Sequence, residues 1–190
     1  EWQDASFAPG RRLAGGERFE LDAGVTLTAI HTPGHASNHL CYRLDEEKTL
    51  FTGDHVMQGS TVVINPPDGD MGTYLASLQR LLDIELDWFA PGHGFLMAQP
   101  HDEVRRLLAH RRAREAKVLA ALQQAVGPVT AAALVPAVYV DVPVARHGIA
   151  ERSLLAHLQH LAEEGRVVRD EVRGEWQSTD AGQPPSIGRH

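Results

Sequence analysis

The sequence predicts a mixed α/β protein made of two folded units, and three observations support this class. Short runs that alternate apolar and polar residues fill positions 18–52, separated by turn residues, a pattern typical of β-hairpins. Leucines and valines recur at helical spacing through positions 70–125. Beyond Gly127 and Pro128 the composition changes, and two short helical patterns precede a pair of strand-like runs.

Two hairpins are expected in the first part of the chain. Their turns fall at 22–24, which contains Asp and Gly, and at 45–48, where all four residues are charged, and both favour an exposed chain reversal. The sheet should therefore contain at least four strands. The expected strands are 18–21, 25–30, 39–44 and 49–52.

A loop, a helix and a further strand follow. Pro66, Pro67 and Gly69 cannot continue a strand or a helix, so they predict a loop. Asp70 occupies the position of an N-cap for an amphipathic helix that should reach about residue 85. A short strand is expected at 88–90, ending at the Pro-Gly-His-Gly segment.

A long helix should run from about residue 102 to 125, where Gly127 and Pro128 end it. Its valines and leucines can form one apolar face, and its arginines are expected outside that face. These arginines are the best candidates for contact with an anionic substrate, although a solvated helix face is the more common explanation. The arginines concerned are Arg105, Arg106, Arg111, Arg112 and Arg114.

The last third of the chain predicts a winged helix. Helical patterns at 130–139 and 150–164 precede strand-like runs at 167–171 and 175–178, which form a wing around a Gly-containing turn. The residues after Asp180 are rich in Gly, Pro and Ser, as expected of a flexible tail. The expected divisions are 1–100 for the first unit, 101–126 for a linking helix, 127–178 for the winged helix and 179–190 for the tail.

Composition excludes several classes of protein. The 190 residues are 43% hydrophobic, which suffices for packed cores, and their formal net charge is −7. An acidic protein is a poor candidate for binding that depends mainly on phosphate neutralisation. Cys41 is the single cysteine, so the chain cannot form an internal disulfide or a thiolate zinc cluster. With no long apolar run and no leader-like start, we expect a cytoplasmic protein without membrane contact.

Three short segments carry side chains that can bind metals. Each follows an expected strand, and each contains a glycine that lets the chain turn sharply, so ligands from separate strand ends could meet. Neutral imidazole and carboxylate are accepted by zinc, manganese and iron(II). A lone histidine at a strand end is more often structural, but three such segments in series favour a site. The segments are His31-Thr-Pro-Gly-His35, Phe51-Thr-Gly-Asp54-His55 and Pro91-Gly-His93-Gly94.

In their order and spacing, these segments resemble the second half of the metallo-β-lactamase superfamily. The arginine-rich helix and the winged helix after it are most similar to the β-lactamase-like 2 family. The resemblance implies the C-terminal half of an αββα sandwich followed by a winged helix. It also implies that His35 binds a first metal, His93 binds a second and Asp54 bridges the two. The implied reaction is hydrolysis by metal-activated water, with two divalent transition metal ions, zinc in the first place and manganese or iron as alternatives.

The other ligands of this superfamily lie in a His-x-His-x-Asp-His motif, which is absent from the 190 residues. The chain would then give each metal one histidine and a shared carboxylate, fewer than the three or four ligands that hold zinc tightly. We therefore expect an incomplete and inactive fragment of a longer enzyme. Without the missing half, apolar faces of the sheet would be uncovered, and self-association through the exposed sheet should follow.

Several alternatives remain open at this stage. His31 and His55 could lie next to the ligands or near substrate, although a structural role is the commoner one for each. A small acyl substrate such as a thioester or ester is favoured over a phosphodiester, with a single-strand-specific endoribonuclease of the same fold as the alternative. The winged helix is too acidic to favour nucleic acid and could instead wall the cleft. A non-catalytic interaction module is the alternative outside enzymes.

Overall fold

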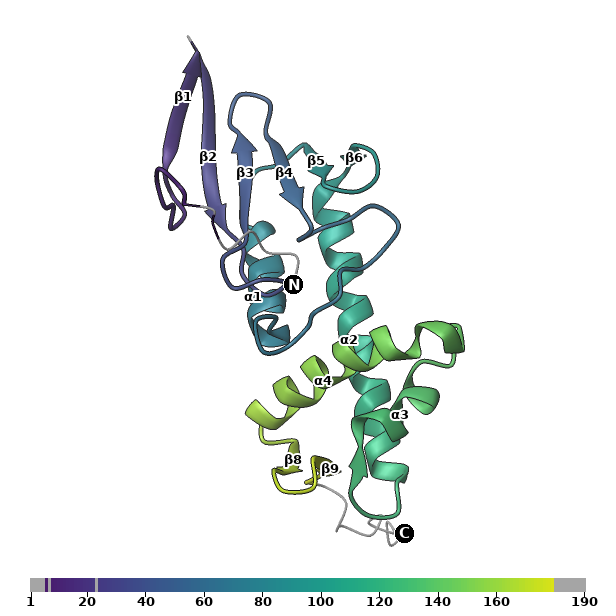
Figure 1. Ribbon diagram of the computed structural model, residues 1–190. Coiled ribbons are helices and arrows are strands. Elements are labelled where there is room, and N and C mark those ends of the chain that lie inside the picture. The colour runs from purple at the N-terminus through teal and green to yellow at the C-terminus, as the bar shows by residue number, and fades with distance from the viewer. Residues whose placement is uncertain (1–5, 7, 23, 180–190) are drawn as a thin grey trace, which may run out of the picture.

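The computed structural model describes residues 6, 8–22 and 24–179, and all structural statements concern these residues. It shows two units joined by one long helix, α2 (Pro100–Gln124), which begins behind the sheet and ends among the elements of the second unit (Figure 1). The predicted tail lies outside the described residues from residue 180 onward.

The first unit is built on a six-stranded sheet in the order β1-β2-β3-β4-β5-β6. All neighbouring pairs are antiparallel except β4 and β5, which are parallel. The four predicted hairpin strands are present, and the two-residue strand β6 adds an edge that the sequence pattern did not indicate. The strands are β1 (Arg18–Asp22), β2 (Val25–His31), β3 (Leu40–Leu44), β4 (Thr49–Gly53), β5 (Trp88–Pro91) and β6 (Met97–Ala98).

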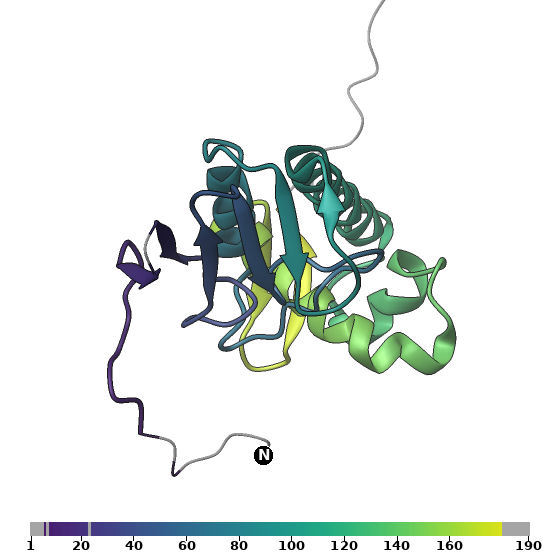
Figure 2. The same ribbon diagram turned by 90° about the horizontal axis from the view of Figure 1, so that it is seen from above.

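Two helices cover one face of this sheet. The helix α1 (Met71–Leu81) and the first part of α2 lie on the same side of the strands (Figure 2). Asp70 caps α1 as predicted, because its side chain accepts a hydrogen bond from the Thr73 amide. The helix ends at Leu81, about four residues earlier than predicted. The core between sheet and helices contains Cys41, Leu50, Phe89, Leu78, Leu81, Val104 and Leu107.

The opposite face of the sheet carries exposed aromatic side chains. Phe51 on β4 is 45% exposed and Trp88 on β5 is 43% exposed, although both lie in the middle of the sheet order. Phe51 pairs with Tyr42 and with Ala90 across the neighbouring strands, so these positions share this face. The predicted uncovered apolar face is therefore observed among the described residues.

The second unit has its own sheet and its own core. A three-stranded sheet in the order β7-β9-β8 packs with two helices, and the helix α4 starts three residues before the predicted position. Trp176 and Leu154 are buried in this core, to which α2 adds Val118 and Leu122. The elements are β7 (Val129–Thr130), α3 (Ala131–Val138), the 3₁₀ turn η1 (Val144–Arg146), α4 (His147–Glu163), β8 (Val167–Asp170) and β9 (Glu175–Ser178).

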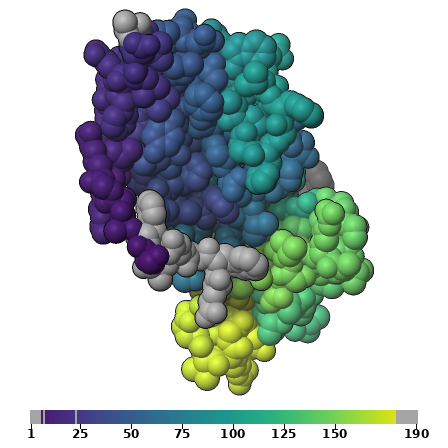
Figure 3. All heavy atoms as spheres, turned by 45° about the horizontal axis from the view of Figure 1, so that its top comes forward, coloured from purple at the N-terminus to yellow at the C-terminus, as the bar shows by residue number. Residues whose placement is uncertain are grey.

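The middle of α2 corrects one prediction. Arg111 and Arg114 were expected outside the apolar face, but they are only 3% and 7% exposed. Both line the junction between the 61–63 segment of the first unit and the residues before α4 in the second. Figure 3 shows the two units packed against each other. Arg114 pairs with Asp141, and its guanidinium stacks on Tyr139.

No described helix has the length and apolar character needed to cross a membrane.

The cap of α1 can be tested by removing its side chain. We expect Asp70→Ala to lower the free energy of unfolding by about 1 kcal/mol, because the Thr73 amide loses its acceptor. Chemical denaturation measures this difference. Asp83→Ala, just beyond the other end of the helix, should change stability little, and equal effects for the two variants would contradict the capping role.

The exposed aromatic face leads to a second expectation. We expect the 190-residue chain to self-associate as its concentration rises, with Phe51 and Trp88 buried between copies. Sedimentation velocity should show dimers or larger species that disappear in the double variant Phe51→Ser and Trp88→Ser. Val172→Ser, which removes an exposed valine from the wing, should leave association unchanged. A chain that stays monomeric at all concentrations would argue against this use of the face.

Candidate metal centre

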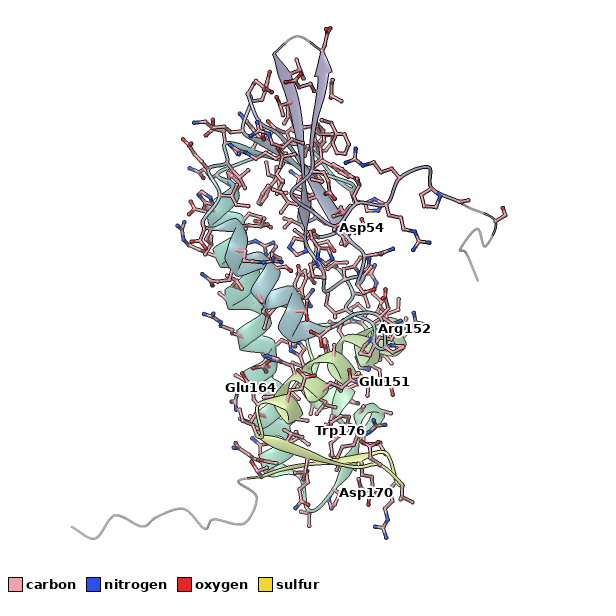
Figure 4. The ribbon with its side chains drawn as sticks, turned by 90° about the vertical axis from the view of Figure 1, so that its left-hand side faces the viewer. Asp54, Glu151, Arg152, Glu164, Asp170 and Trp176 are labelled. Atoms are coloured by element: carbon pink, nitrogen blue, oxygen red, sulfur yellow. The ribbon has the colours of Figure 1, made fainter. Side chains whose placement is uncertain are left out.

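The three predicted ligands meet at one end of the sheet. His35 follows β2, Asp54 follows β4 and His93 follows β5. The Nε2 atom of His93 lies 3.5 Å from Asp54 Oδ1, and the Nε2 atom of His35 lies 4.0 Å from Asp54 Oδ2. Each carboxylate oxygen thus faces a different imidazole. Asp54 lies at the end of the sheet that faces the second unit, toward Glu151 and Arg152 of α4 (Figure 4).

Glycines allow the chain segments to approach this closely. A Cβ atom at position 92 would lie 3.1 Å from the Gly53 carbonyl oxygen and 3.4 Å from Asp54 Oδ1, so a side chain there would crowd the site. Gly34 has a φ of +133°, and a Cβ atom there would lie 2.3 Å from Tyr74 Cα. These glycines bring the loop that carries His35 onto α1 and the loop that carries His93 beside Asp54.

A hydrogen bond fixes the orientation of His35. Its Nδ1–H donates to the carbonyl oxygen of Val63, 2.9 Å away. Nδ1 therefore carries a proton, and Nε2 is the ring nitrogen that faces Asp54. This is the arrangement of a histidine that binds a metal through Nε2. The donor set of two imidazole nitrogens and a carboxylate with two separated oxygens fits two neighbouring cations.

Two further histidines lie beside the three ligands. The ring of His39 is 6.5 Å from that of His35 and 5.9 Å from that of His55, measured between centroids. Burial, with a smaller contribution from nearby His35, lowers the pKa of His39, and burial lowers the pKa of His55 to about 3. Both imidazoles are therefore neutral near pH 7, and they do not add positive charge where cations would bind.

The two histidines predicted to lie next to the ligands, His31 and His55, have different surroundings in the structure. His55 is fully buried against Tyr74, and neither of its ring nitrogens has a hydrogen-bond partner among the described residues. His31 instead bonds through Nε2 to the Ser37 carbonyl oxygen. His39 was not predicted at the site. The Thr32 hydroxyl and the Nδ1 atom of His39 form a hydrogen bond. In the sequence, only the four-residue spacing from His35 could have indicated that His39 lies at the site.

A second group of potential ligands lies at the junction of the two units. Glu115 on α2, His160 on α4 and Glu164 offer ligand atoms within 4.8 Å of one another. Arg166 already pairs with both carboxylates, at 3.5 Å from Glu115 and 3.0 Å from Glu164. Although burial opposes it, the neighbouring imidazoles of His157 and His160 lower the pKa of Glu115, and His160 forms a hydrogen bond with that carboxylate. The group therefore forms a charged contact that holds α4 against α2.

Comparisons with known proteins identify both units. Residues 3–93 match the metallo-beta-lactamase superfamily, and residues 130–176 match the beta-lactamase associated winged helix domain. These matches place residues 3–93 in the metallo-beta-lactamase superfamily and residues 130–176 in the winged helix family associated with it. This confirms the family and the fold that the sequence motifs predicted.

Individual relatives agree with this assignment. The chain is 36% identical to an atrochrysone carboxyl ACP thioesterase of Claviceps purpurea, over 58% of this chain and 34% of that protein. It is 32% identical to the lactamase-like protein notP of an Aspergillus species, over 89% of this chain and 56% of that protein. A solved metallo-beta-lactamase family protein from Thermus thermophilus is 30% identical, with a TM-score of 0.76 over 87% of this chain and 53% of that one. The chain thus spans between one third and somewhat more than half of these proteins.

Metal binding by the chain itself can be measured directly. We expect weak binding of Co²⁺ or Zn²⁺, because the chain offers few ligands per ion, and we expect Asp54→Asn or His93→Ala to reduce the affinity about tenfold or more. Isothermal titration calorimetry measures the change. Glu164→Gln tests the second group and should leave this binding unchanged. Equal loss in Glu164→Gln would instead locate the ion at the junction.

Proposed function

We propose that this chain carries half of the active site of a two-metal hydrolase that cleaves thioesters. The single observation that carries the proposal is that the two oxygens of Asp54 face the Nε2 atoms of two different histidines, His35 and His93. One carboxylate in that position can bind two cations at once and neutralise part of their charge. Two cations held there would supply an activated water for attack on the acyl carbon and would stabilise the resulting oxyanion.

The chain's own residues prepare this site before any substrate binds. The Val63 carbonyl keeps His35 in the tautomer and orientation that direct Nε2 at the carboxylate. Burial keeps His39 and His55 neutral beneath the site. His93 is the most exposed of the three ligands, so it borders the side from which substrate would approach.

Thioesters are the preferred substrate class because of two independent observations. The Claviceps purpurea relative is named an atrochrysone carboxyl ACP thioesterase, and a second relative, from Emericella nidulans, is named the thioesterase pkgB. The first unit is acidic in amino-acid composition, which disfavours a long polyanion such as RNA. Both support a small acyl substrate over a phosphodiester.

We propose further that the remaining metal ligands come from residues outside this chain. The three ligands identified give each ion only one histidine and a shared oxygen, which is too few for tight binding. The open aromatic face of the sheet fits a second layer that would bring those ligands. The 190-residue chain alone should accordingly be inactive.

The proposal is tested on the complete protein supplied with zinc or manganese. Against a panel of acyl thioesters, we expect metal-dependent hydrolysis that falls about 100-fold or more in Asp54→Ala, because both cations lose a shared ligand. A labelled single-stranded RNA in the same assay tests the ribonuclease alternative.

A control at the other end of the same strands sharpens this test. Asp87 precedes β5 and is exposed, at the end of β4 and β5 opposite to Asp54 and His93. Asp87→Ala should keep the activity of the unmodified protein. Unchanged turnover in Asp54→Ala would remove the bridging carboxylate from the mechanism.

A further inference from the structure

A cavity of about 320 Å³ lies where the two units meet. Its walls are the 61–63 segment of the first unit, the middle of α2 and the first turns of α4 with the loop before it. Its size falls within the range of small-molecule binding sites. Val62, Val142 and Ile149 give it an apolar part, and Arg111, Arg114 and Arg146 give it a positively charged part.

Arg111 is the unusual member of this wall. Its side chain is almost completely buried, yet no carboxylate of the described residues forms an ion pair with it, and its Nε atom has no hydrogen-bond partner. One terminal nitrogen donates to the Val62 carbonyl, and the guanidinium lies over the Tyr74 ring. Buried charges are normally paired, because an isolated ion loses its hydration without compensation. A guanidinium left in this state on a cavity wall indicates an anionic ligand.

The other charged residues of the cavity wall also give it a net positive charge. Among the lining residues, Asp141 is the only carboxylate opposite three arginines, and Arg114 already engages it. Arg146 is exposed and forms no ion pair among the described residues. It also occupies the N-cap position of α4, where no side chain caps the helix and no acidic residue follows in the first turn. A cation at that end of a helix is unfavourable unless an anion accompanies it.

The cavity is connected to the metal centre by two consecutive residues. The Val62 carbonyl accepts from Arg111, and the Val63 carbonyl accepts from His35. A group bound by the arginines would therefore lie against the same segment that orients His35. Anion recognition and the proposed hydrolytic site thus depend on adjacent residues, Val62 and Val63.

We propose that this cavity binds the phosphate of the phosphopantetheine arm of a thioester substrate. The inference rests on the proposed thioesterase function and names the part of the substrate that the winged helix unit would recognise. Acyl carrier proteins and coenzyme A both carry this arm, in which an apolar dimethyl-substituted carbon lies close to the phosphate and a flexible chain with two amide groups leads on to the thioester. A bidentate guanidinium suits a phosphate, and the apolar residues of the cavity suit the dimethyl-substituted carbon next to it.

Binding to the 190-residue chain tests this without any catalysis. We expect phosphopantetheine to bind, and pantetheine, which lacks the phosphate, to bind about tenfold more weakly or worse. Arg146→Gln should weaken phosphopantetheine binding about fivefold to tenfold and leave pantetheine unaffected. Arg112→Gln, an exposed arginine of α2 that does not line the cavity, is the matched control and should bind like the unmodified chain. Coenzyme A is measured in parallel. If it binds more tightly than phosphopantetheine, the substrate is a coenzyme A thioester and not a thioester of an acyl carrier protein.

Arg111→Gln provides a second variant, accepted only if its thermal unfolding remains cooperative. Equal affinity for phosphopantetheine and pantetheine would overturn the inference, as would unchanged binding in Arg146→Gln. Binding of a short single-stranded RNA that exceeds phosphopantetheine binding and depends on Arg146 would also overturn it, in favour of a phosphodiester ligand. Because metal and turnover play no part, these outcomes are independent of whether the complete protein hydrolyses thioesters.

Discussion

The parallel pairing of β4 with β5 is the constraint on which the rest of the site depends. Every other neighbouring pair in this sheet is antiparallel, and α1 makes the crossover that returns the chain in the same direction. Parallel strands end at the same edge, so Asp54 and His93 emerge side by side from segments 39 residues apart. The loop after β2 is held at the same edge by the close approach of Gly34 to Tyr74 and by the hydrogen bond between His35 and the Val63 carbonyl.

Much of this arrangement could be predicted from the sequence because it is local. A glycine next to each of His35, Asp54 and His93 marks a chain reversal at a strand end, and three such reversals in series indicate a common site. The hairpins and the cap at Asp70 are likewise set by a few adjacent residues. Such features need no knowledge of which elements pack together.

The features that escaped prediction are set by packing between distant segments. Strand β6 has two residues, too few for any periodicity, and is recognisable only from its pairing with β5. His39 reaches the site because β3 starts one residue after it, not because of a motif. Arg111 and Arg114 look like solvated residues in a charged helix. Their burial follows from the fact that α2 serves two cores, which a single helical pattern cannot reveal.

The continuity of α2 through both cores also fixes how the chain can vary in length. Val104 and Leu107 pack under the sheet, while Val118 and Leu122 pack inside the winged helix, along one uninterrupted helix. One residue inserted between these pairs would turn the second unit by about 100° about the helix axis and shift it by about 1.5 Å. The length of the helix between the two cores therefore fixes the orientation of one unit relative to the other. Insertions or deletions should be tolerated in the surface turns but excluded from this stretch.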